Sequence, residues 1–185
     1  MDEVKEEKQA ISNDVSKRLE SFTADEVSEK SRHIESRLFD FANFIESYVI
    51  LLYLNNSGEV DTRGIINRAL AMNKVVVLPA GNAGGKAPVL LKLNGTQSDI
   101  IVNDQGHPAP NPARCRPVPV ESIELALVPG LVFDEKGARI GTGSGFYDKL
   151  IPQLPATTRK VSLAFEDQII QQVPTPPDVT IVKGT

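Results

Sequence analysis

Two near-continuous apolar runs restrict the folds open to this chain. Residues 48–54 (YVILLYL) and 75–79 (VVVLP) lack the polar–apolar alternation of a strand with one solvent-exposed face. Such runs are typical of strands buried on both faces of a sheet. Residues 65–70 between them carry apolar side chains at helical spacing, after a candidate N-cap at Asp61 or Thr62. The sequence therefore predicts a strand–helix–strand unit with a right-handed crossover in a parallel sheet.

The first part of the chain carries two amphipathic helical patterns. From Asp2 to Glu20 the apolar residues fall on one helical stripe. Thr23 and Glu26 have the spacing of a capping box, in which each side chain bonds the backbone of the other residue. The apolar pattern after this box continues to Ile45. These patterns predict an N-terminal helical hairpin.

The rest of the chain carries shorter patterns. They predict strands at residues 89–93, 125–128, 160–165 and 179–182, and a short helix at residues 167–172. Residues 104–119 are rich in proline, which predicts a loop or a lid. We expect a single α/β domain over residues 1–185, with a three-layer α/β/α arrangement and a mostly parallel, Rossmann-like sheet.

Composition argues against several classes of protein. A net charge of −4 and a pI of about 5.3 are not those of a nucleic-acid-binding protein. Cys115 is the only cysteine, so the chain has no internal disulfide framework and no cysteine-based zinc site. It also lacks a nearby histidine that could activate it as a nucleophile. No apolar run approaches the ~18 residues of a membrane span. We expect a cytoplasmic monomer that binds neither nucleic acid nor membrane.

The segment from Leu127 to Leu150 is the strongest candidate for a ligand site. Glycines alternate in its GTGSG stretch, residues 141–145, just after the cation Arg139. Alternate glycines let the backbone N–H groups approach an anion, and a helix starting near Gly145 adds the positive end of its dipole. The spacing matches neither a dinucleotide fingerprint nor a P-loop. A phosphate-binding loop and a tight strand–helix turn without ligand both remain open on this pattern.

Two aspartates near this loop have different expected roles. Asp148 lies in the first turn of the predicted helix, where it can point back toward the anion site. Mg²⁺ bound with a nucleotide typically takes one or two protein carboxylates plus phosphate oxygens and waters. Asp134 begins the turn that ends at Gly137, and we expect it to shape that turn.

Two other segments suggest ligand sites less strongly. Residues 81–86 (GNAGGK) follow a predicted strand, but the glycines are one residue too close together for a P-loop and Ala87 replaces the hydroxyl residue. They are interpreted as a flexible loop. Glu59 follows a buried strand at the end where ligands gather in open α/β sheets, but on this position alone a solvated loop acid is the favoured interpretation.

The chain resembles the 5-formyltetrahydrofolate cyclo-ligases, also called methenyltetrahydrofolate synthetases. The resemblance rests on residues 128–148 (VPGLVFDEKGARIGTGSGFYD), with support from residues 52–62, residues 163–169 and the helix near Lys8. It implies ATP-dependent cyclisation of 5-formyltetrahydrofolate, with or without a polyglutamate tail, to 5,10-methenyltetrahydrofolate. The γ-phosphoryl group of ATP would pass to the formyl oxygen, releasing ADP and then phosphate. Such chemistry needs positioning and charge neutralisation, which agrees with the absence of a nucleophilic triad.

The resemblance also implies roles for individual residues. Lys8, Arg139 and Asp148 would act in catalysis, and Asp148 and Asp178 would hold Mg²⁺. The residues implied to bind ATP are Lys8, Arg139, Ile140, Gly141, Thr142, Gly143, Ser144, Gly145, Phe146 and Tyr147. Those implied to bind folate are Leu54, Glu59, Thr142, Gly143, Ser144, Gly145 and Phe146. Ser12 stands where the family has an arginine, and Phe146 replaces the first of two tyrosines.

Two other functions are compatible with the same loop. One is a protein that binds folate or a nucleotide with little or no turnover. The other is a sugar-phosphate isomerase-like enzyme that would use the glycine loop for a substrate phosphate and would work without ATP. Product formation that depends on ATP separates both from the cyclo-ligase reaction.

Overall fold

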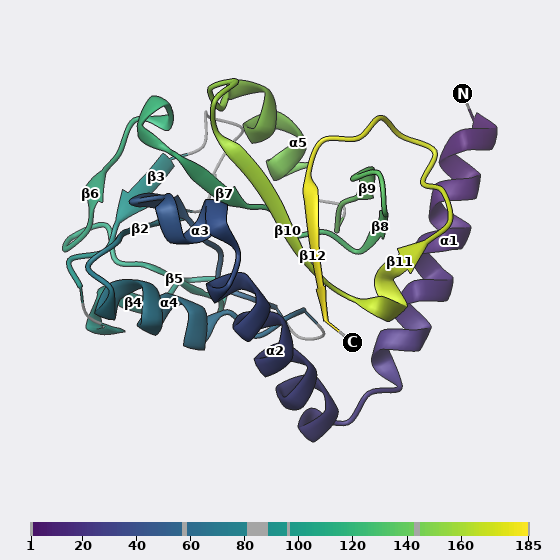
Figure 1. The fold of residues 1–185 in the computed structure, drawn as a ribbon, viewed down its shortest axis with the longest axis horizontal. Coiled ribbons are helices and arrows are strands. Elements are labelled where there is room, and N and C mark those ends of the chain that lie inside the picture. The colour runs from purple at the N-terminus through teal and green to yellow at the C-terminus, as the bar shows by residue number, and fades with distance from the viewer. Residues whose placement is uncertain (1, 57–58, 81–88, 96, 143–144, 185) are drawn as a thin grey trace.

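A computed structural model describes residues 2–56, 59–80, 89–95, 97–142 and 145–184 of the chain. Figure 1 shows its α/β arrangement. The α-helices are α1 Asp2–Glu20, α2 Ala24–Phe39, α3 Ala42–Glu46, α4 Arg63–Ala71 and α5 Phe146–Leu150. Short 3₁₀ turns are η1 Gln97–Asp99, η2 Val120–Ser122, η3 Ile151–Gln153 and η4 Glu166–Gln168.

The described strands form one large sheet and two small ones. The large sheet has the order β12-β10-β7-β1-β2-β3-β6, and its strands are β12 Thr180–Gly184, β10 Arg159–Phe165, β7 Leu125–Leu127, β1 Val49–Leu51, β2 Val75–Ala80, β3 Val89–Lys92 and β6 Arg116–Pro117. The five strands from β12 to β2 run parallel, and β3 and β6 extend the sheet in antiparallel fashion. The predicted mostly parallel sheet is confirmed.

The strand–helix–strand unit also forms as predicted. Val49 lies opposite Val75 in the parallel β1–β2 pair, and α4 connects the two strands. Thr62 is the N-cap of α4, but its side chain makes no capping bond. Instead, Asp61 Oδ1 accepts the backbone N–H of Arg63 at 3.0 Å. Asp61 therefore satisfies a donor in the first turn, where backbone N–H groups lack intrahelical partners.

Helices cover both faces of the large sheet unequally. One face packs against α2, α3 and α4, whose buried residues include Ile34, Phe44 and Ile65. The other face packs against α5 and η3 through Leu150 and Ile151. This gives the predicted α/β/α layers, with a thin second helical layer. None of the described helices is long and apolar enough to cross a membrane.

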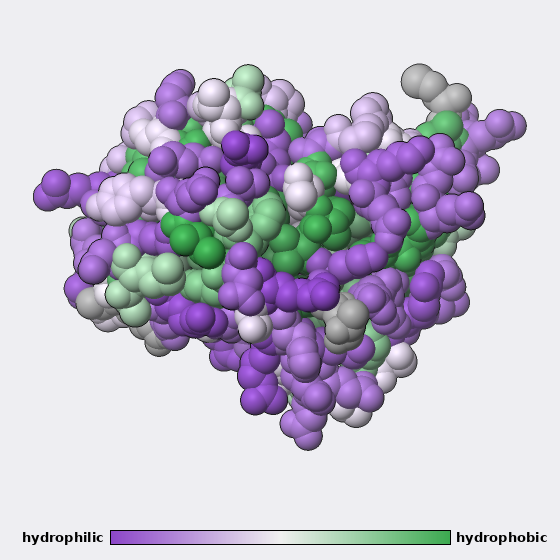
Figure 2. Space-filling view, in the orientation of Figure 1, coloured by the Kyte–Doolittle hydropathy of each residue, from purple (hydrophilic) through white to green (hydrophobic). Residues whose placement is uncertain are grey.

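Both predicted N-terminal helices are present, and they diverge from the turn that joins them. The Thr23–Glu26 capping box is present, with bonds of 3.1 and 2.9 Å. In Figure 1 the helices splay apart, and α1 packs against β8 and η4 whereas α2 packs against β10 and β12. The surface in this orientation is largely hydrophilic, and apolar side chains gather mainly in its middle, where β10 and β12 lie (Figure 2).

Two predicted helices are wrong in extent or type. The second N-terminal helix does not continue to Ile45, because it ends at Phe39 and the backbone of Phe41 is extended before α3 begins. The helix predicted at residues 167–172 is replaced by η4 and strand β11, Ile169–Ile170. Gln168 causes this change, since its side chain bonds Phe165 N, Gly130 O and Leu131 O and so fixes a tight turn. β11 then pairs with β8, Val132–Asp134.

The proline-rich region has more structure than a loop. It contains β5, Pro108–Pro110, which pairs with β4, Ile100–Val102, and it ends in β6. Buried Asp99 fixes the base of this excursion by accepting bonds from Asn94 N at 2.7 Å and Arg114 Nε at 3.1 Å. Because β5 lies against β2, the excursion covers the carboxyl end of a central strand.

Candidate active site

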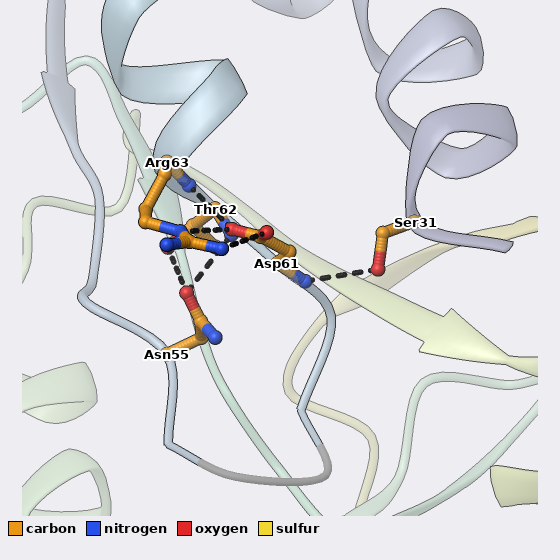
Figure 3. A network of polar contacts seen from close by, with 5 residues as sticks. All are labelled: Ser31, Asn55, Asp61, Thr62 and Arg63. Carbon is orange, nitrogen blue, oxygen red and sulfur yellow. Dashed lines mark hydrogen bonds and ion pairs between the residues drawn. The ribbon is translucent and has the colours of Figure 1, made fainter. Parts of the chain in front are cut away.

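The loop after β1 is fixed at both ends by polar contacts. Thr62 Oγ1 donates to Tyr53 O at 2.6 Å, and Asn55 Oδ1 accepts the Thr62 N–H at 3.1 Å. Ser31, on α2, accepts the backbone N–H of Asp61 at 3.0 Å, so the loop is also tied to a helix (Figure 3). This network holds the described part of the loop, including Glu59, at the carboxyl edge of the sheet.

Glu59 is partly buried and anchored by its own loop. Its Oε2 accepts the Asn56 N–H at 2.8 Å. Burial raises the pKa of the Glu59 carboxyl, and the hydrogen bonds from Asn56 offset part of that rise. Burial, followed by the negative charge of Glu59, raises the pKa of both Tyr53 and Tyr147. The carboxyl group and the two phenols therefore share one apolar environment.

This environment is a cavity of about 230 Å³. Strand ends supply its walls: Tyr53 and Leu54 follow β1, Pro79 lies near the end of β2, and Pro129 follows β7. Leu54 and Phe146, both implied by the resemblance to bind folate, line it together with Glu59 and Thr142. Sites outside the carboxyl ends of parallel strands are where open α/β sheets bind ligands.

A wider cleft of about 870 Å³ adjoins this cavity. Glu59, Asn56 and Thr142 line both spaces. The cleft extends past Gly130, after β7, to residues at the α1–α2 turn that include Leu19 and Phe22. A long ligand with one end in the cavity beside Glu59 can therefore extend into the adjoining cleft.

The turn before the glycine loop is built by Asp134 and Gly137. Burial alone would raise the pKa of Asp134, but hydrogen bonds from Val173, Ala138, Lys136 and Gly137 hold it below its usual value. Asp134 is therefore structural, as the sequence predicted. Its turn joins β8 to β9, Arg139–Ile140, in an antiparallel hairpin that the sequence did not predict.

Gly137 brings the tail of the chain against this hairpin. Its φ of +97° is in the region that favours glycine, and a Cβ atom there would lie 1.8 Å from Val179 O. The carbonyl of Gly137 accepts the backbone N–H of Asp178 at 3.0 Å and of Val179 at 3.2 Å. Asp178 is consequently placed next to β9.

Arg139 is the centre of a charged cluster. Its side chain is only 2% exposed, and its Nη2 donates to Asp148 Oδ1 at 2.7 Å. Its Nε lies 3.5 Å from Asp178 Oδ2, and its Nη1 donates to Pro129 O at 3.4 Å. The structure thus brings together Arg139, Asp148 and Asp178, three residues implied by the resemblance, from separate parts of the chain.

The two aspartates of this cluster have donor atoms suited to a hard cation. Asp148 is 68% exposed and Asp178 is 34% exposed. Burial raises the pKa of Asp178; Arg139 and Lys160 oppose this shift, and nearby Asp148 adds to it. Asp178 Oδ1 is buried without a hydrogen-bond partner among the described residues. Two carboxylates with an unused oxygen fit Mg²⁺ shared with a nucleotide.

The described part of the chain offers no larger metal site. No group of three or more His, Cys, Asp or Glu residues in it could hold a metal ion. A metal bound by Asp148 and Asp178 therefore needs further oxygen ligands from a substrate or from water. This requirement matches the way Mg²⁺ is bound in phosphoryl-transfer sites.

The glycine loop leads into α5 as predicted. Gly145 has a φ of +71° and is the N-cap of that helix, which begins at Phe146. Thr142 is exposed and borders the cleft, the Glu59 cavity and a space of about 10 Å³ enclosed by Arg139, Gly141 and Asp148. Ile140 closes β9. Gly143 and Ser144, and the GNAGGK segment at residues 81–86, lie outside the described residues.

Lys8 lies on α1, is half-buried, and makes no hydrogen bond or ion pair with the Arg139 cluster among the described residues. It precedes Ile11 by one helical turn, so both lie on one face of α1. Ile11 packs against an apolar cluster that includes Ala138 of the β8–β9 hairpin. The face of α1 that carries Ile11 therefore lies against the same apolar cluster as the hairpin that carries Arg139.

Several residues of this region were not identified as site residues from the sequence. Tyr53, Asn56 and Pro129 line the Glu59 cavity, and Gln168 lines the cleft. Only their positions could have indicated a role, because each of them follows a strand of the parallel part of the sheet. The charge of Lys160 opposes the rise in the pKa of Asp178. Nothing in the sequence placed Lys160 near the site, because it lies inside a strand.

The fold is that of an α/β protein, and its candidate ligand site lies at the carboxyl ends of parallel strands, beside Arg139 and a carboxylate pair. The model of the 5-formyltetrahydrofolate cyclo-ligase family matches residues 4–183 of this chain. The chain belongs to that family.

Individual relatives agree with this assignment. The 5-formyltetrahydrofolate cyclo-ligase of Escherichia coli strain K12 is 23% identical over 161 residues, which cover 86% of this chain and 88% of that protein. The enzyme of the same name from Haemophilus influenzae is 24% identical over 171 residues, which cover 92% and 91%. The solved structure of Aquifex aeolicus 5,10-methenyltetrahydrofolate synthetase has a TM-score of 0.80 at 25% identity, covering 95% of this chain and 89% of that chain.

Proposed function

We propose that this protein uses ATP to cyclise 5-formyltetrahydrofolate to 5,10-methenyltetrahydrofolate, releasing ADP and phosphate. The observation that carries the proposal is the family match over residues 4–183. The geometry adds support, because the Arg139–Asp148–Asp178 cluster and the Glu59 cavity meet at Thr142. A site for a triphosphate and a site for a ring system would then adjoin one another.

The proposed chemistry proceeds in two steps. The formyl oxygen attacks the γ-phosphorus of ATP, the bond from that phosphorus to the bridging oxygen breaks, and ADP leaves. The lone pair of folate N10 then attacks the activated formyl carbon, N10 loses its proton, and the C–O bond breaks to release phosphate. Each step moves charge without a protein nucleophile, so catalysis depends on positioning and charge neutralisation.

On the ATP side, we assign the cationic groups to Arg139 and Lys8. Arg139 is held rigidly by its two aspartates, which supports a fixed donor for phosphate oxygens. Lys8 would approach from α1. The loop from Ile140 to Tyr147 would contribute backbone N–H groups, and those of Phe146 and Tyr147 belong to the first turn of α5.

We assign Mg²⁺ binding to Asp148 and Asp178, on the strength of the unbonded Asp178 Oδ1 and the nearby Asp148 carboxylate. When bound, the metal would neutralise charge on the transferring phosphoryl group. Arg139 would keep both carboxylates in place through its ion pairs. Electrostatic repulsion between the two carboxylates is reduced because this guanidinium lies between them.

On the folate side, we assign recognition of the pterin ring to Glu59. A carboxylate has two acceptor oxygens, which suit the amino group and ring N–H of a pterin. Leu54 and Phe146 would pack on the ring, since both line the same cavity. Thr142 would face both substrates.

We further propose that residues 1–185 act as one domain and as a monomer in the cytoplasm. One family model matches residues 4–183 as a single unit, which supports the single domain.

The test is an absorbance assay with 5-formyltetrahydrofolate, ATP and Mg²⁺, because the methenyl product absorbs in the near ultraviolet. Growth of that band together with ADP supports the proposal. Tight folate binding with neither product would instead identify a binding protein without turnover. A phosphate-sugar reaction without ATP would identify the isomerase-like alternative.

A further inference from the structure

The cavity that contains Glu59 is too small for a whole folate. Its volume is about 230 Å³, whereas sites for ligands of this size span roughly 300–1,000 Å³. A second cavity of about 350 Å³ shares Leu54 and Pro108 with it. A ring bound beside Glu59 would therefore continue, through its aminobenzoyl group, into the space beyond Leu54.

The second cavity has both apolar and polar lining residues. Leu54, Ile100 and Pro108 offer apolar surface that suits a benzoyl ring, and Asn55 and Arg63 add polar groups. Arg63 and Asn55 also line the 870 Å³ cleft. Arg63 therefore borders both of the spaces that adjoin the Glu59 cavity.

Arg63 is the only cation among the described residues that line these three spaces. The other charged lining residues are Glu20, Glu59 and Asp61. An anionic end of a ligand in this region would be repelled by the carboxylates. Among the described lining residues, Arg63 is therefore the one favourable partner for such an anionic group.

The guanidinium of Arg63 is held in one orientation by Asp61, and part of its hydrogen-bonding capacity is free. Asp61 accepts its Nε at 3.1 Å and its Nη2 at 2.9 Å, as Figure 3 shows. The side chain is 76% exposed, and its Nη1 makes no hydrogen bond with any residue that the structure describes. A guanidinium has five N–H donors in a rigid fork, so a second edge remains open to a carboxylate.

We propose that Arg63 binds a carboxylate of the glutamyl tail of the folate substrate. This inference rests on the proposed folate site. Asp61 acts as a positioning residue, because it fixes the plane of the guanidinium from the loop side. Additional glutamyl units would extend from Arg63 into the open cleft, where they meet no further cation among the described lining residues. Arg63 should therefore contribute to the affinity for mono- and polyglutamates alike.

Calorimetry with two ligands tests this assignment separately from turnover. One ligand is 5-formyltetrahydrofolate, and the other is its diamide, in which both glutamate carboxylates are carboxamides. The wild-type protein should bind the acid about tenfold more tightly than the diamide, as expected for a charge-assisted hydrogen bond. Arg63→Gln should weaken binding of the acid about tenfold and leave the diamide unchanged. Arg63→Lys should retain an intermediate preference, because it keeps the charge and loses the fork.

The matched control is Arg68→Gln. Arg68 is on the same helix, is 53% exposed and lines none of these spaces. It should leave both affinities unchanged. Equal affinities of wild type and Arg63→Gln for the acid would overturn the inference, as would an equal loss for acid and diamide. Methenyl product without an Arg63 effect refutes this inference alone, whereas an Arg63 effect without product refutes only the proposed reaction.

Discussion

Arg139 Nη2 lies 2.7 Å from Asp148 Oδ1, and this ion pair joins a buried guanidinium to an exposed carboxylate. The pair is asymmetric, since one partner is fixed inside the protein and the other faces the glycine loop. Asp148 can therefore exchange solvent for a ligand while Arg139 keeps it in position. Asp178 completes the arrangement on the other side of the guanidinium.

Asp148→Asn should reduce turnover on the order of 100-fold, the usual effect of removing one group that stabilises charge in the transition state. The Mg²⁺ concentration for half-maximal rate should rise as well. Stability should change by about 1 kcal/mol or less, because the asparagine keeps an oxygen that can accept the Arg139 hydrogen bond and Asp178 still pairs with the buried guanidinium. The measurements are the near-ultraviolet assay over a range of Mg²⁺ and thermal unfolding. Lys149→Gln, a change in the exposed neighbour, is the control; equal rates for both variants would refute the metal assignment.

Glu59→Gln should raise the KM for folate by about 10- to 100-fold with little change in the KM for ATP, because it removes a charge from a hydrogen bond to the substrate. Wild-type affinity for folate should fall as the pH is lowered through the raised pKa of Glu59, since the protonated carboxyl loses acceptor capacity. This fall should occur above the pH range of an ordinary glutamate and should be absent in the variant. Calorimetry from about pH 4.5, near the ordinary pKa of a glutamate, to about pH 8 gives both results. An identical pH profile for the two proteins would exclude Glu59 from folate binding.

Gly137→Ala should lower the free energy of unfolding by about 3 kcal/mol or more, because a strained φ and a steric clash with Val179 O add together. Gly106→Ala is the matched control, since Gly106 also has a positive φ but has nothing within 4 Å of the position that an added methyl group would take. That variant should lose only about 1 kcal/mol. Urea denaturation measures both. Equal losses would show that the approach of the tail to Gly137 is not tight.

Asp99→Asn should loosen the excursion that carries Pro108, because it removes the charge of a buried carboxylate that accepts two hydrogen bonds. Since Pro108 borders both folate-side cavities, we expect a several-fold rise in the KM for folate and none in the KM for ATP. Hydrogen exchange at residues 100–102 should become faster. Asp104→Asn, an exposed change in the same excursion, should do neither. Unchanged exchange in Asp99→Asn would refute the anchoring role.

The parts of the fold that depend on local pattern were predictable. The capping box at Thr23 and the parallel pairing of β1 with β2 follow from side-chain type and spacing within one short segment. The start of α5 at Gly145 follows from the glycine spacing in the same way. These features need no knowledge of distant contacts.

The parts that depend on tertiary contacts were not predictable. β9 and β11 have two residues each, too few to show a periodic pattern, and they exist because β8 pairs with both. The false helix at residues 167–172 has the same origin, since Gln168 bonds carbonyl groups from the segment after β7. Local propensity cannot report such bonds.

In the candidate site too, local relationships were predictable and tertiary contacts were not. Arg139 and Asp148 are close in sequence, so their pairing could be anticipated from the loop. Asp178 lies close to Arg139 and Asp148 because Gly137 accepts its backbone N–H. No local sequence pattern near Asp178 predicts that contact. Its candidacy came from the family resemblance alone.

The most direct test of the proposed function is simultaneous measurement of methenyl product and ADP from the wild-type protein with 5-formyltetrahydrofolate and Mg·ATP. The proposal predicts a growing near-ultraviolet band, one ADP released for each product formed, and neither signal when ATP is omitted. Product without ATP, or ADP release without product, would contradict coupled phosphoryl transfer. Folate binding with neither product nor ADP would contradict the reaction itself.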